Sequence, residues 1–171
     1  MENLTIEKLK KMFDAASKVV AEQEEYLCKL DSACGDGDHG VAIKGAMDAA
    51  NASIQSASNL KDAFFDAGMS AMANSNGSTS SIYGTLFMGV SDGIEAGAES
   101  LDAQALAKAF KVGLASMRDV VKGDVGDKTC FDALIPAINA MEGKNSVAEV
   151  FQKGYILGDK VVRPACVKVA N

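Results

Sequence analysis

The chain of 171 residues has no tryptophan, two prolines, one histidine and 6% aromatic residues. So few prolines argue against a disordered or collagen-like chain. No apolar run reaches the roughly 18 residues that a membrane span requires, and the first residues lack the apolar core of a signal peptide. The four cysteines form no CxxC pair and, with one histidine, make no zinc pattern. We therefore expect a reduced, cytoplasmic protein with no membrane partner.

Alanine and acidic residues are what the sequence has in abundance. The 27 alanines and eight methionines favour helices over sheets. Acidic residues outnumber basic ones by 23 to 17, giving a net charge of −6. Because phosphate backbones are bound by basic patches, this balance argues against a nucleic-acid partner. The length suits one domain, which we expect to span residues 1–171.

Hydrophobic periodicity predicts seven helices joined by short polar loops. We found no segment with convincing strand alternation. The expected helices cover residues 5–30, 41–54, 60–72, 81–96, 103–121 and 129–141, and a seventh opens at the capping-box pattern Ser146-Val147-Ala148-Glu149. Short loops make neighbouring helices antiparallel, so the predicted fold class is all-α.

The densest motif is the acidic, glycine-rich stretch from Asp31 to Gly40. Its glycines formally match the dinucleotide pattern GxGxxG, but a helix precedes them where that pattern needs a strand. Asp36 and Asp38 would also meet a pyrophosphate with like charge. Each such pair costs on the order of 4 kcal/mol at about 4 Å and an effective dielectric of ~20. These two arguments exclude a dinucleotide site.

A divalent cation between the carboxylates and the phosphates would make their interaction favourable. Asp31, Asp36 and Asp38 can supply hard oxygen ligands to magnesium, and phosphate oxygens and water can fill the remaining positions. The helix that begins near His39 or Gly40 would direct unpaired N–H groups at the same phosphates. The spacing does not fit an EF-hand, which needs a glutamate at the end of its loop. The alternative is that Asp36 and Asp38 only cap a helix.

Two further polar loops stand at helix starts, Asn76–Ser81 and Gly126–Thr129. Each can offer N–H and hydroxyl donors to a nucleotide, although ordinary N-capping would use the same residues. Three such helix starts in one all-α chain indicate that several helix N-termini converge on one anionic ligand.

These motifs resemble, in their order along the chain, the nucleotide-binding L subunit of dihydroxyacetone kinase. The matching pieces are Asp31 with Gly35-Asp36-Gly37-Asp38-His39-Gly40, Tyr83-Gly84-Thr85, Gly126-Asp127-Lys128-Thr129, Asp132-Ala133-Leu134 and Pro136. The resemblance implies a closed barrel of about seven to eight antiparallel helices. It also implies a phosphotransferase that transfers a phosphoryl group to an alcohol group.

The resemblance assigns roles to individual residues. Asp31, Asp36 and Asp38 match the aspartates that hold two magnesium ions against ADP or ATP, and they carry the catalytic role. Phosphate contacts fall on the helix start His39, Gly40, Val41 and Ala42, and nucleotide contacts fall on Ser78, Thr79, Gly126, Thr129 and Cys130. In the tail, where the family's Asp-Pro-Gly segment is absent, we expect Lys160 to replace a nucleotide-binding arginine.

The resemblance also implies partners. A dihydroxyacetone-binding K subunit would present dihydroxyacetone or a similar short ketose, and a phosphotransferase-system phosphocarrier would rephosphorylate the bound ADP. Free ATP is the alternative phosphate donor. Two other possibilities stay open, a fatty acid kinase nucleotide domain and a non-catalytic regulator of the same family. The single histidine His39 and the short chain argue against the fatty acid kinase.

Overall fold

The computed structural model describes residues 3–74, 77–141, 146–152, 155–157, 160–163 and 166–170. These residues form two compact units, Met1–Lys122 and Gly123–Asn171. Each unit has its own architecture.

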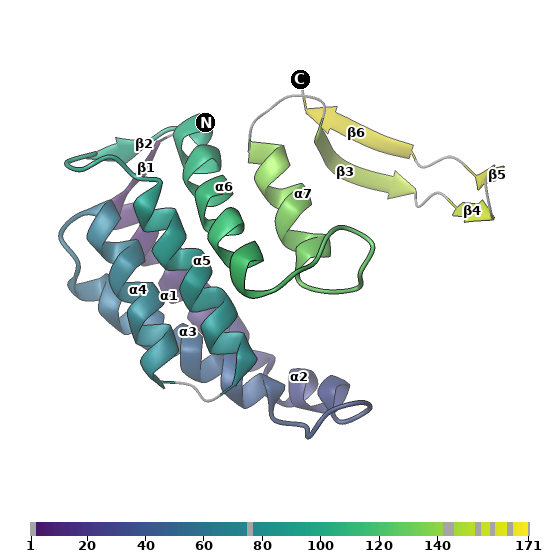
Figure 1. The fold of residues 1–171 in the computed structure, drawn as a ribbon, viewed down its shortest axis with the longest axis horizontal. Coiled ribbons are helices and arrows are strands. Elements are labelled where there is room, and N and C mark those ends of the chain that lie inside the picture. The colour runs from purple at the N-terminus through teal and green to yellow at the C-terminus, as the bar shows by residue number, and fades with distance from the viewer. Residues whose placement is uncertain are drawn as a thin grey trace. The chain divides into compact units, whose positions relative to one another are not determined.

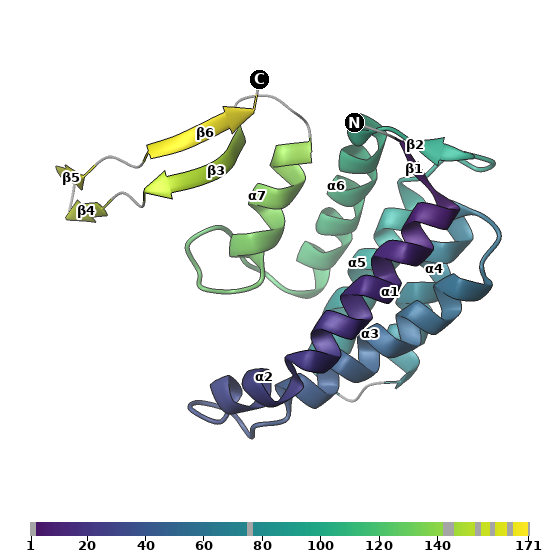
Figure 2. The same ribbon diagram turned by 180° about the vertical axis from the view of Figure 1, so that it is seen from behind.

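The first unit is a row of helices. Its elements are β1 (Leu4–Thr5), α1 (Ile6–Glu22), α2 (Glu24–Asp31), α3 (His39–Ser56), α4 (Leu60–Asn74), α5 (Ser78–Asp92), β2 (Ser100–Leu101) and α6 (Ala103–Val120). Helices α1, α3, α4, α5 and α6 pack in that order, each against the next (Figures 1 and 2). The short helix α2 packs on α3 and carries the acidic loop at its end.

A two-residue antiparallel ribbon joins the two ends of the row. Leu4 pairs with Leu101 and Thr5 with Ser100, so the start of α1 lies beside the start of α6. Each helix has a side-chain cap there. The Thr5 hydroxyl accepts the Lys8 N–H at 3.4 Å, and the Asp102 carboxylate accepts the Ala105 N–H at 2.8 Å. The ribbon and caps fix this end of the unit.

Four phenylalanines from four helices form the centre of the first unit. Phe13, Phe64, Phe87 and Phe110 contact one another with ring centroids 5.5 to 6.5 Å apart, mostly edge to face. Phe64 is almost fully buried. Alanine is the commonest of the other buried residues in this unit, and it lets the helix backbones approach closely.

The glycines of α5 mark where helices touch through their backbones. A Cβ atom on Gly89 would stand 2.8 Å from the Cα of Gly113, and one on Gly93 would stand 2.6 Å from the Cα of Ala109. On the other side of α5, Gly84 faces Gly68 and Met72 of α4. Glycine inside a helix lowers stability relative to alanine, and here close packing against α4 and α6 offsets that loss.

The second unit combines one helix with paired strands. It holds α7 (Phe131–Met141), β3 (Ser146–Gln152), β4 (Tyr155–Leu157), β5 (Lys160–Arg163) and β6 (Cys166–Ala170). Strand β3 pairs with β6 and β4 with β5, both antiparallel. Each pair is a two-stranded ribbon, and α7 lies next to β3.

Several helix boundaries differ from the sequence prediction, among them the end of the helix expected over 81–96, which stops at Asp92. Two of the differences have a visible cause. The helix expected over residues 5–30 is interrupted at Gln23, whose N–H is shared between the carbonyls of Val19 and Val20 and whose ψ is 1°. No proline or glycine marks this break in the sequence. Helix α5 begins three residues earlier than expected because the Ser80 hydroxyl donates to the Gly77 carbonyl at 3.0 Å, which draws the serine-rich loop into its first turn.

The seventh helix expected from Ser146 is wrong, because that segment is strand β3. The capping-box pattern covers four residues only. The segment that follows is rich in β-branched residues, which favour strands: Val147, Val150, Val161, Val162, Val167 and Val169. The expectation that no segment forms a strand was therefore also wrong.

The all-α prediction is confirmed for the fold as a whole, with seven helices in the described part of the chain. Within the first unit, α1, α3, α4, α5 and α6 each run antiparallel to the next (Figure 2). None of the helices among the described residues is long and apolar enough to pass through a bilayer. The expectation of one domain over residues 1–171 stays a prediction.

The backbone contact between α5 and α6 predicts that Gly113→Ala destabilises the protein, although glycine-to-alanine changes stabilise exposed helices. An alanine methyl at Gly113 would stand 2.6 Å from the Leu86 carbonyl oxygen and 2.8 Å from a methyl of Val90. We expect Gly113→Ala to lower the free energy of unfolding by about 1–3 kcal/mol, although the same change in an exposed helix stabilises by up to ~1 kcal/mol. Urea unfolding followed by circular dichroism measures it. Gln104→Ala, exposed on the same helix, is the control and should change stability by less than about 0.5 kcal/mol. An unchanged or raised stability in Gly113→Ala would contradict the packing.

Candidate functional site

Three carboxylates gather where α2 ends and α3 begins. One oxygen each from Asp31, Asp36 and Asp38 can be chosen so that all three lie within 4.8 Å of one another. Asp31 is the last residue of α2, and the other two lie in the loop before α3. Asp31 is partly exposed, and Asp36 and Asp38 are exposed. The structure thus brings together the three residues that the sequence predicted as magnesium ligands.

Glycines make the tight loop between the aspartates possible. Gly37 has φ of 81°, in the left-handed region, and its N–H donates to the Asp31 carboxylate at 2.9 Å. A Cβ on Gly35 would collide with the same carboxylate. Any side chain at Gly35 would therefore displace Asp31, which explains why the motif places small residues between its acids.

The carboxylates repel one another. The pKa of Asp38 is raised above its usual value, first because it shares a hydrogen bond with Asp36, then because of the Asp36 charge, with smaller contributions from desolvation and from Asp31. A hard cation between these groups would relieve the repulsion, and carboxylate oxygens are the ligands that magnesium prefers. The donor set therefore fits magnesium, as predicted.

The helix start behind the aspartates is uncapped by side chains. Asp38 stands at the N-cap of α3, but its carboxylate makes no capping hydrogen bond. The alternative in which Asp38 serves only as a helix cap does not match this geometry. The first N–H groups of a helix have no intrahelical partner and carry a partial positive charge. The residues His39 to Val41 place such groups directly beside the acidic cluster.

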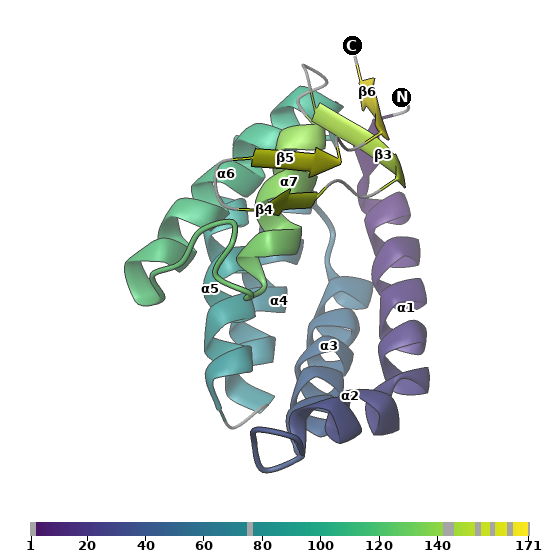
Figure 3. The same cartoon turned by 90° about the vertical axis from the view of Figure 1, so that its right-hand side faces the viewer.

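A second helix start meets the first. Helix α5 begins at Ser78 after Gly77, whose φ is 126°, and its N-cap also lacks a side-chain hydrogen bond. The Thr79 hydroxyl lies 3.5 Å from Nδ1 of His39. Figures 1 and 3 show the starts of α3 and α5 at the same end of the helix row. Two of the three predicted helix starts therefore converge beside the aspartates.

The third predicted loop belongs to the second unit and is ordered by one carboxylate. Asp132, in the first turn of α7, accepts the Gly126 N–H at 2.8 Å and the Thr129 N–H at 2.9 Å. These two N–H groups, Gly126 first, hold the pKa of Asp132 below its usual value. The loop needs this support because Gly126 and Lys128 have φ of 106° and 59°. Cys130, half-buried, follows the loop.

Asp132 is the residue whose importance the sequence analysis missed. It was noted only as part of a motif, with no role. Its signal was present, because Thr129-x-x-Asp132 is the spacing at which a side chain in the first helical turn reaches back to the N-cap. Lys160 lies in β5, opposite Leu157 of β4. Its side chain lies outside the described part of the structure, so its nucleotide contact stays a prediction.

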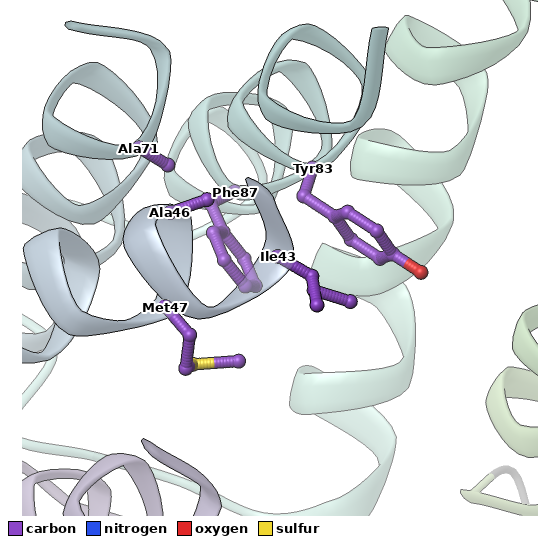
Figure 4. Close-up of a pocket in the computed structure, with 6 residues that line it drawn as sticks. All are labelled: Ile43, Ala46, Met47, Ala71, Tyr83 and Phe87. Carbon is purple, nitrogen blue, oxygen red and sulfur yellow. The ribbon is translucent and has the colours of Figure 1, made fainter. Parts of the chain in front are cut away.

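An apolar cavity of about 170 Å³ lies between α3, α4 and α5 in the first unit. Figure 4 shows the side chains around it, which are Ile43, Ala46, Met47, Ala71, Tyr83 and Phe87. The lining contains no carboxylate, amine or imidazole. The chemistry expected of a phosphoryl-transfer site therefore resides in the acidic loop and not in this cavity.

Comparison with known proteins agrees with the motif at the acidic loop. The DAK2 domain family matches residues 33–162, about three quarters of the chain. The chain belongs to the DAK2 domain family. This family match begins inside the acidic loop and includes Asp36, Asp38, both helix starts and the loop ordered by Asp132.

Curated relatives of this DAK2 chain are kinase subunits. It is 31% identical over 135 residues to the ADP-binding subunit DhaL of PEP-dependent dihydroxyacetone kinase 1 from Listeria innocua, which covers 78% of this chain and 67% of that protein. It is 26% identical to the DhaL subunit of the PTS-dependent dihydroxyacetone kinase of Lactococcus lactis, over 88% of this chain and 76% of the relative. A second Listeria innocua DhaL subunit is matched over 62% of its length.

Solved structures show the same fold. The native dihydroxyacetone kinase of C. freundii matches 77% of this chain and 24% of its own with a TM-score of 0.65 at 26% identity. The same enzyme in complex with AMP-PNP and Mg2+ matches 82% of this chain and 26% of its own, with a TM-score of 0.69 at 23% identity. The all-α fold class inferred from the resemblance is therefore confirmed.

A short similarity points to a different protein. Over 33 residues, 18% of this chain, the sequence is 66% identical to protein GrpE of Caldanaerobacter subterraneus. A second GrpE, from Clostridium beijerinckii, is 69% identical over 29 residues. These identities are about twice those to the DhaL subunits and are confined to a short stretch.

Charge repulsion in the acidic loop predicts that removing one charge stabilises the metal-free protein. Because the folded-state pKa of Asp38 is raised, its ionised form weakens folding once pH rises through that pKa. We expect Asp38→Asn to raise the melting temperature at pH 7 in chelator, and to have no effect below the usual pKa of 3.8. Scanning fluorimetry at the two pH values measures this. Asp66→Asn, exposed in the middle of α4, is the matched control. A lower melting temperature for Asp38→Asn at pH 7 would refute the repulsion.

The hydrogen bonds of Asp132 predict local loosening. In Asp132→Ala the amides of Gly126 and Thr129 lose their acceptors, so their hydrogen exchange should accelerate, whereas Asp132→Asn keeps one acceptor oxygen and should be intermediate. The folded-state pKa of Asp132 is lowered, so its carboxylate stays ionised at pH 5 and should still protect both amides there. Protection should be lost only as pH falls below 3.8 and through that lowered pKa. Amide NMR measures each site, and Asn139→Ala on α7 serves as the control. Equal exchange in Asp132→Ala and the unaltered chain would show that the loop is ordered by something else.

Proposed function

We propose that this chain is the nucleotide-binding subunit of a dihydroxyacetone kinase, an alcohol-group phosphotransferase. The observation that carries the proposal is the convergence of three carboxylates with the uncapped starts of α3 and α5, inside a DAK2 match. Relatives named as ADP-binding DhaL subunits support the nucleotide.

Each predicted residue except Lys160 has a part in this proposal. Asp31, Asp36 and Asp38 hold magnesium, with two ions expected. When bound, magnesium supplies positive charge against the phosphoryl oxygens of ADP or ATP. The helix start from His39 to Ala42 contacts the phosphates, and the N–H groups of His39, Gly40 and Val41 donate to phosphate oxygens. Ser78 and Thr79 contact the nucleotide from α5. Cys130 lies beside its base, and Gly126 and Thr129 contact the nucleotide. Lys160, which lies in β5, is left out of this set.

Such a site acts by positioning the phosphates and by stabilising their negative charge. The chain's own groups fix the phosphates with helix N–H donors and with carboxylates that bind cations, and they do not form a covalent bond to substrate. Thr79 and His39, 3.5 Å apart, hold the two helix starts in register. This arrangement leaves the nucleophile to a second protein that brings the acceptor.

We propose a short ketose as acceptor, presented by a dihydroxyacetone-binding K subunit. Two further relatives, a D-erythrulose kinase and an L-erythrulose 1-kinase of Mycolicibacterium smegmatis, act on ketoses by name and support this class. We propose a phosphotransferase-system phosphocarrier as the donor that regenerates ATP from bound ADP, in the cytoplasm. The names PEP-dependent and PTS-dependent of the DhaL relatives support it, whereas the AMP-PNP complex of the C. freundii kinase supports free ATP as the alternative.

Titration calorimetry with magnesium-ADP tests the site. Loss of a carboxylate ligand in Asp36→Ala or Asp31→Ala should weaken binding about 10- to 100-fold, the effect of removing one charge-assisted contact. Asp66→Ala, which removes an equal charge from the exposed face of α4, should bind as the unaltered chain does. Unchanged affinity in both acidic-loop variants would refute the metal assignment.

Reconstitution distinguishes a kinase from a regulator. The chain is mixed with a dihydroxyacetone-loaded K subunit and either a phosphoenolpyruvate-charged phosphocarrier or ATP. Dihydroxyacetone phosphate formed with only one donor identifies that donor. Binding of magnesium-ADP with no product from either donor would favour the non-catalytic regulator.

A further inference from the structure

The character of the chain changes after α7. From Ile6 to Met141 the described residues are mainly helical, and the family motifs lie between Asp31 and Pro136. From Ser146 onward every described residue belongs to a strand. The DAK2 match continues to residue 162, but none of the motifs that identify the family lies beyond Pro136.

The strands after α7 form one nested antiparallel arrangement. Outer strands β3 and β6 pair from Ser146 opposite Ala170 to Gln152 opposite Cys166. Inner strands β4 and β5 pair from Tyr155 opposite Arg163 to Leu157 opposite Lys160. The chain therefore runs out along β3 and β4 and returns along β5 and β6. Every strand pairing of the described residues of this segment lies within residues 146–170.

The GrpE similarity is short, close to the length of the last part of the chain. It covers 33 residues at 66% identity and 29 residues at 69% identity, against 31% for the DhaL subunit of Listeria innocua. An identity this high over so few residues stands apart from the identity to the DhaL subunits. We assign it to about the last 30 residues, because the described residues from Ser146 to Ala170 are all strand.

We propose that the chain is composite. The helical part, to about Met141, is a DAK2 nucleotide-binding subunit, and the segment from Ser146 to Ala170 is a β-module of the GrpE type that takes no part in binding the nucleotide. The second half of this statement rests on the proposed function. It opposes the prediction for Lys160, which in a separate β-module has no nucleotide to contact.

A single substitution tests the β-module in the full chain. Gln152 and the native Cys166 are directly opposite each other in the β3–β6 register. Opposed residues of antiparallel strands lie within the Cα separation of about 4.4–6.8 Å that a disulfide needs. We expect Gln152→Cys to form a 152–166 disulfide under mild oxidation, identified by peptide mass spectrometry.

Glu149→Cys is the matched control, because Glu149 lies opposite Lys168, two residues further along β6, and should not cross-link to Cys166. Peptide mapping separates the 152–166 bond from any bond to Cys28, Cys34 or Cys130. Absence of the bond in Gln152→Cys, or equal cross-linking in both variants, would overturn the β-module. This result does not depend on nucleotide binding, so it stands even if the proposed function fails.

Magnesium-ADP calorimetry tests the separation of the two modules. We expect Lys160→Ala to bind within 2-fold of the unaltered chain, and oxidised Gln152→Cys to do the same, while Asp36→Ala loses affinity. A loss of 10-fold or more in Lys160→Ala would overturn the proposal by placing the segment at the nucleotide. If the unaltered chain itself binds no magnesium-ADP, the proposed function fails and the disulfide decides the β-module alone.

Discussion

Repulsion among three carboxylates is the constraint on which the candidate site depends. Asp31, Asp36 and Asp38 lie close enough to share one ion. The pKa of Asp38 is raised because its carboxyl group is harder to ionise beside Asp36 and Asp31. Such a cluster persists because the backbone enforces it. Gly37 adopts a left-handed conformation, and Gly35 leaves the space that the Asp31 carboxylate fills. Repulsion among the ionised carboxylates therefore lowers the stability of the folded chain, and a bound cation would reduce that repulsion.

Small residues also allow close approach between the helices of the first unit. Gly89 of α5 meets Gly113 of α6, and Gly68 of α4 meets Gly84 of α5, so neighbouring backbones approach where larger residues would separate them. Phenylalanines fill the centre, and alanine is the commonest of the other buried residues. Such packing holds the starts of α3 and α5 at one end of the row, where Thr79 reaches His39. Rigid helices therefore position the N–H groups that the acidic loop alone could not place.

The sequence was sufficient for the features set by local chemistry. Helical spacing located α3, α4 and α6 within two residues, and the spacing of acids and glycines identified the cluster before any coordinates. Features decided by geometry were not accessible. The break at Gln23 has no glycine or proline to announce it, and the role of Asp132 depends on two N–H groups in a loop with positive φ. The site as a whole remains a prediction in its nucleotide contacts.

The helix predicted from Ser146 is wrong for a physical reason. A capping box describes four residues, and it is informative only when the residues after it can continue a helix. Here valines follow, spread through a segment that pairs with itself from β3 to β6. Local and global signals therefore disagree at the point where the family motifs end. The conflict lies within β3 itself, whose first four residues are the capping-box pattern. Pairing along the whole strand therefore outweighs a helix signal that covers only four residues.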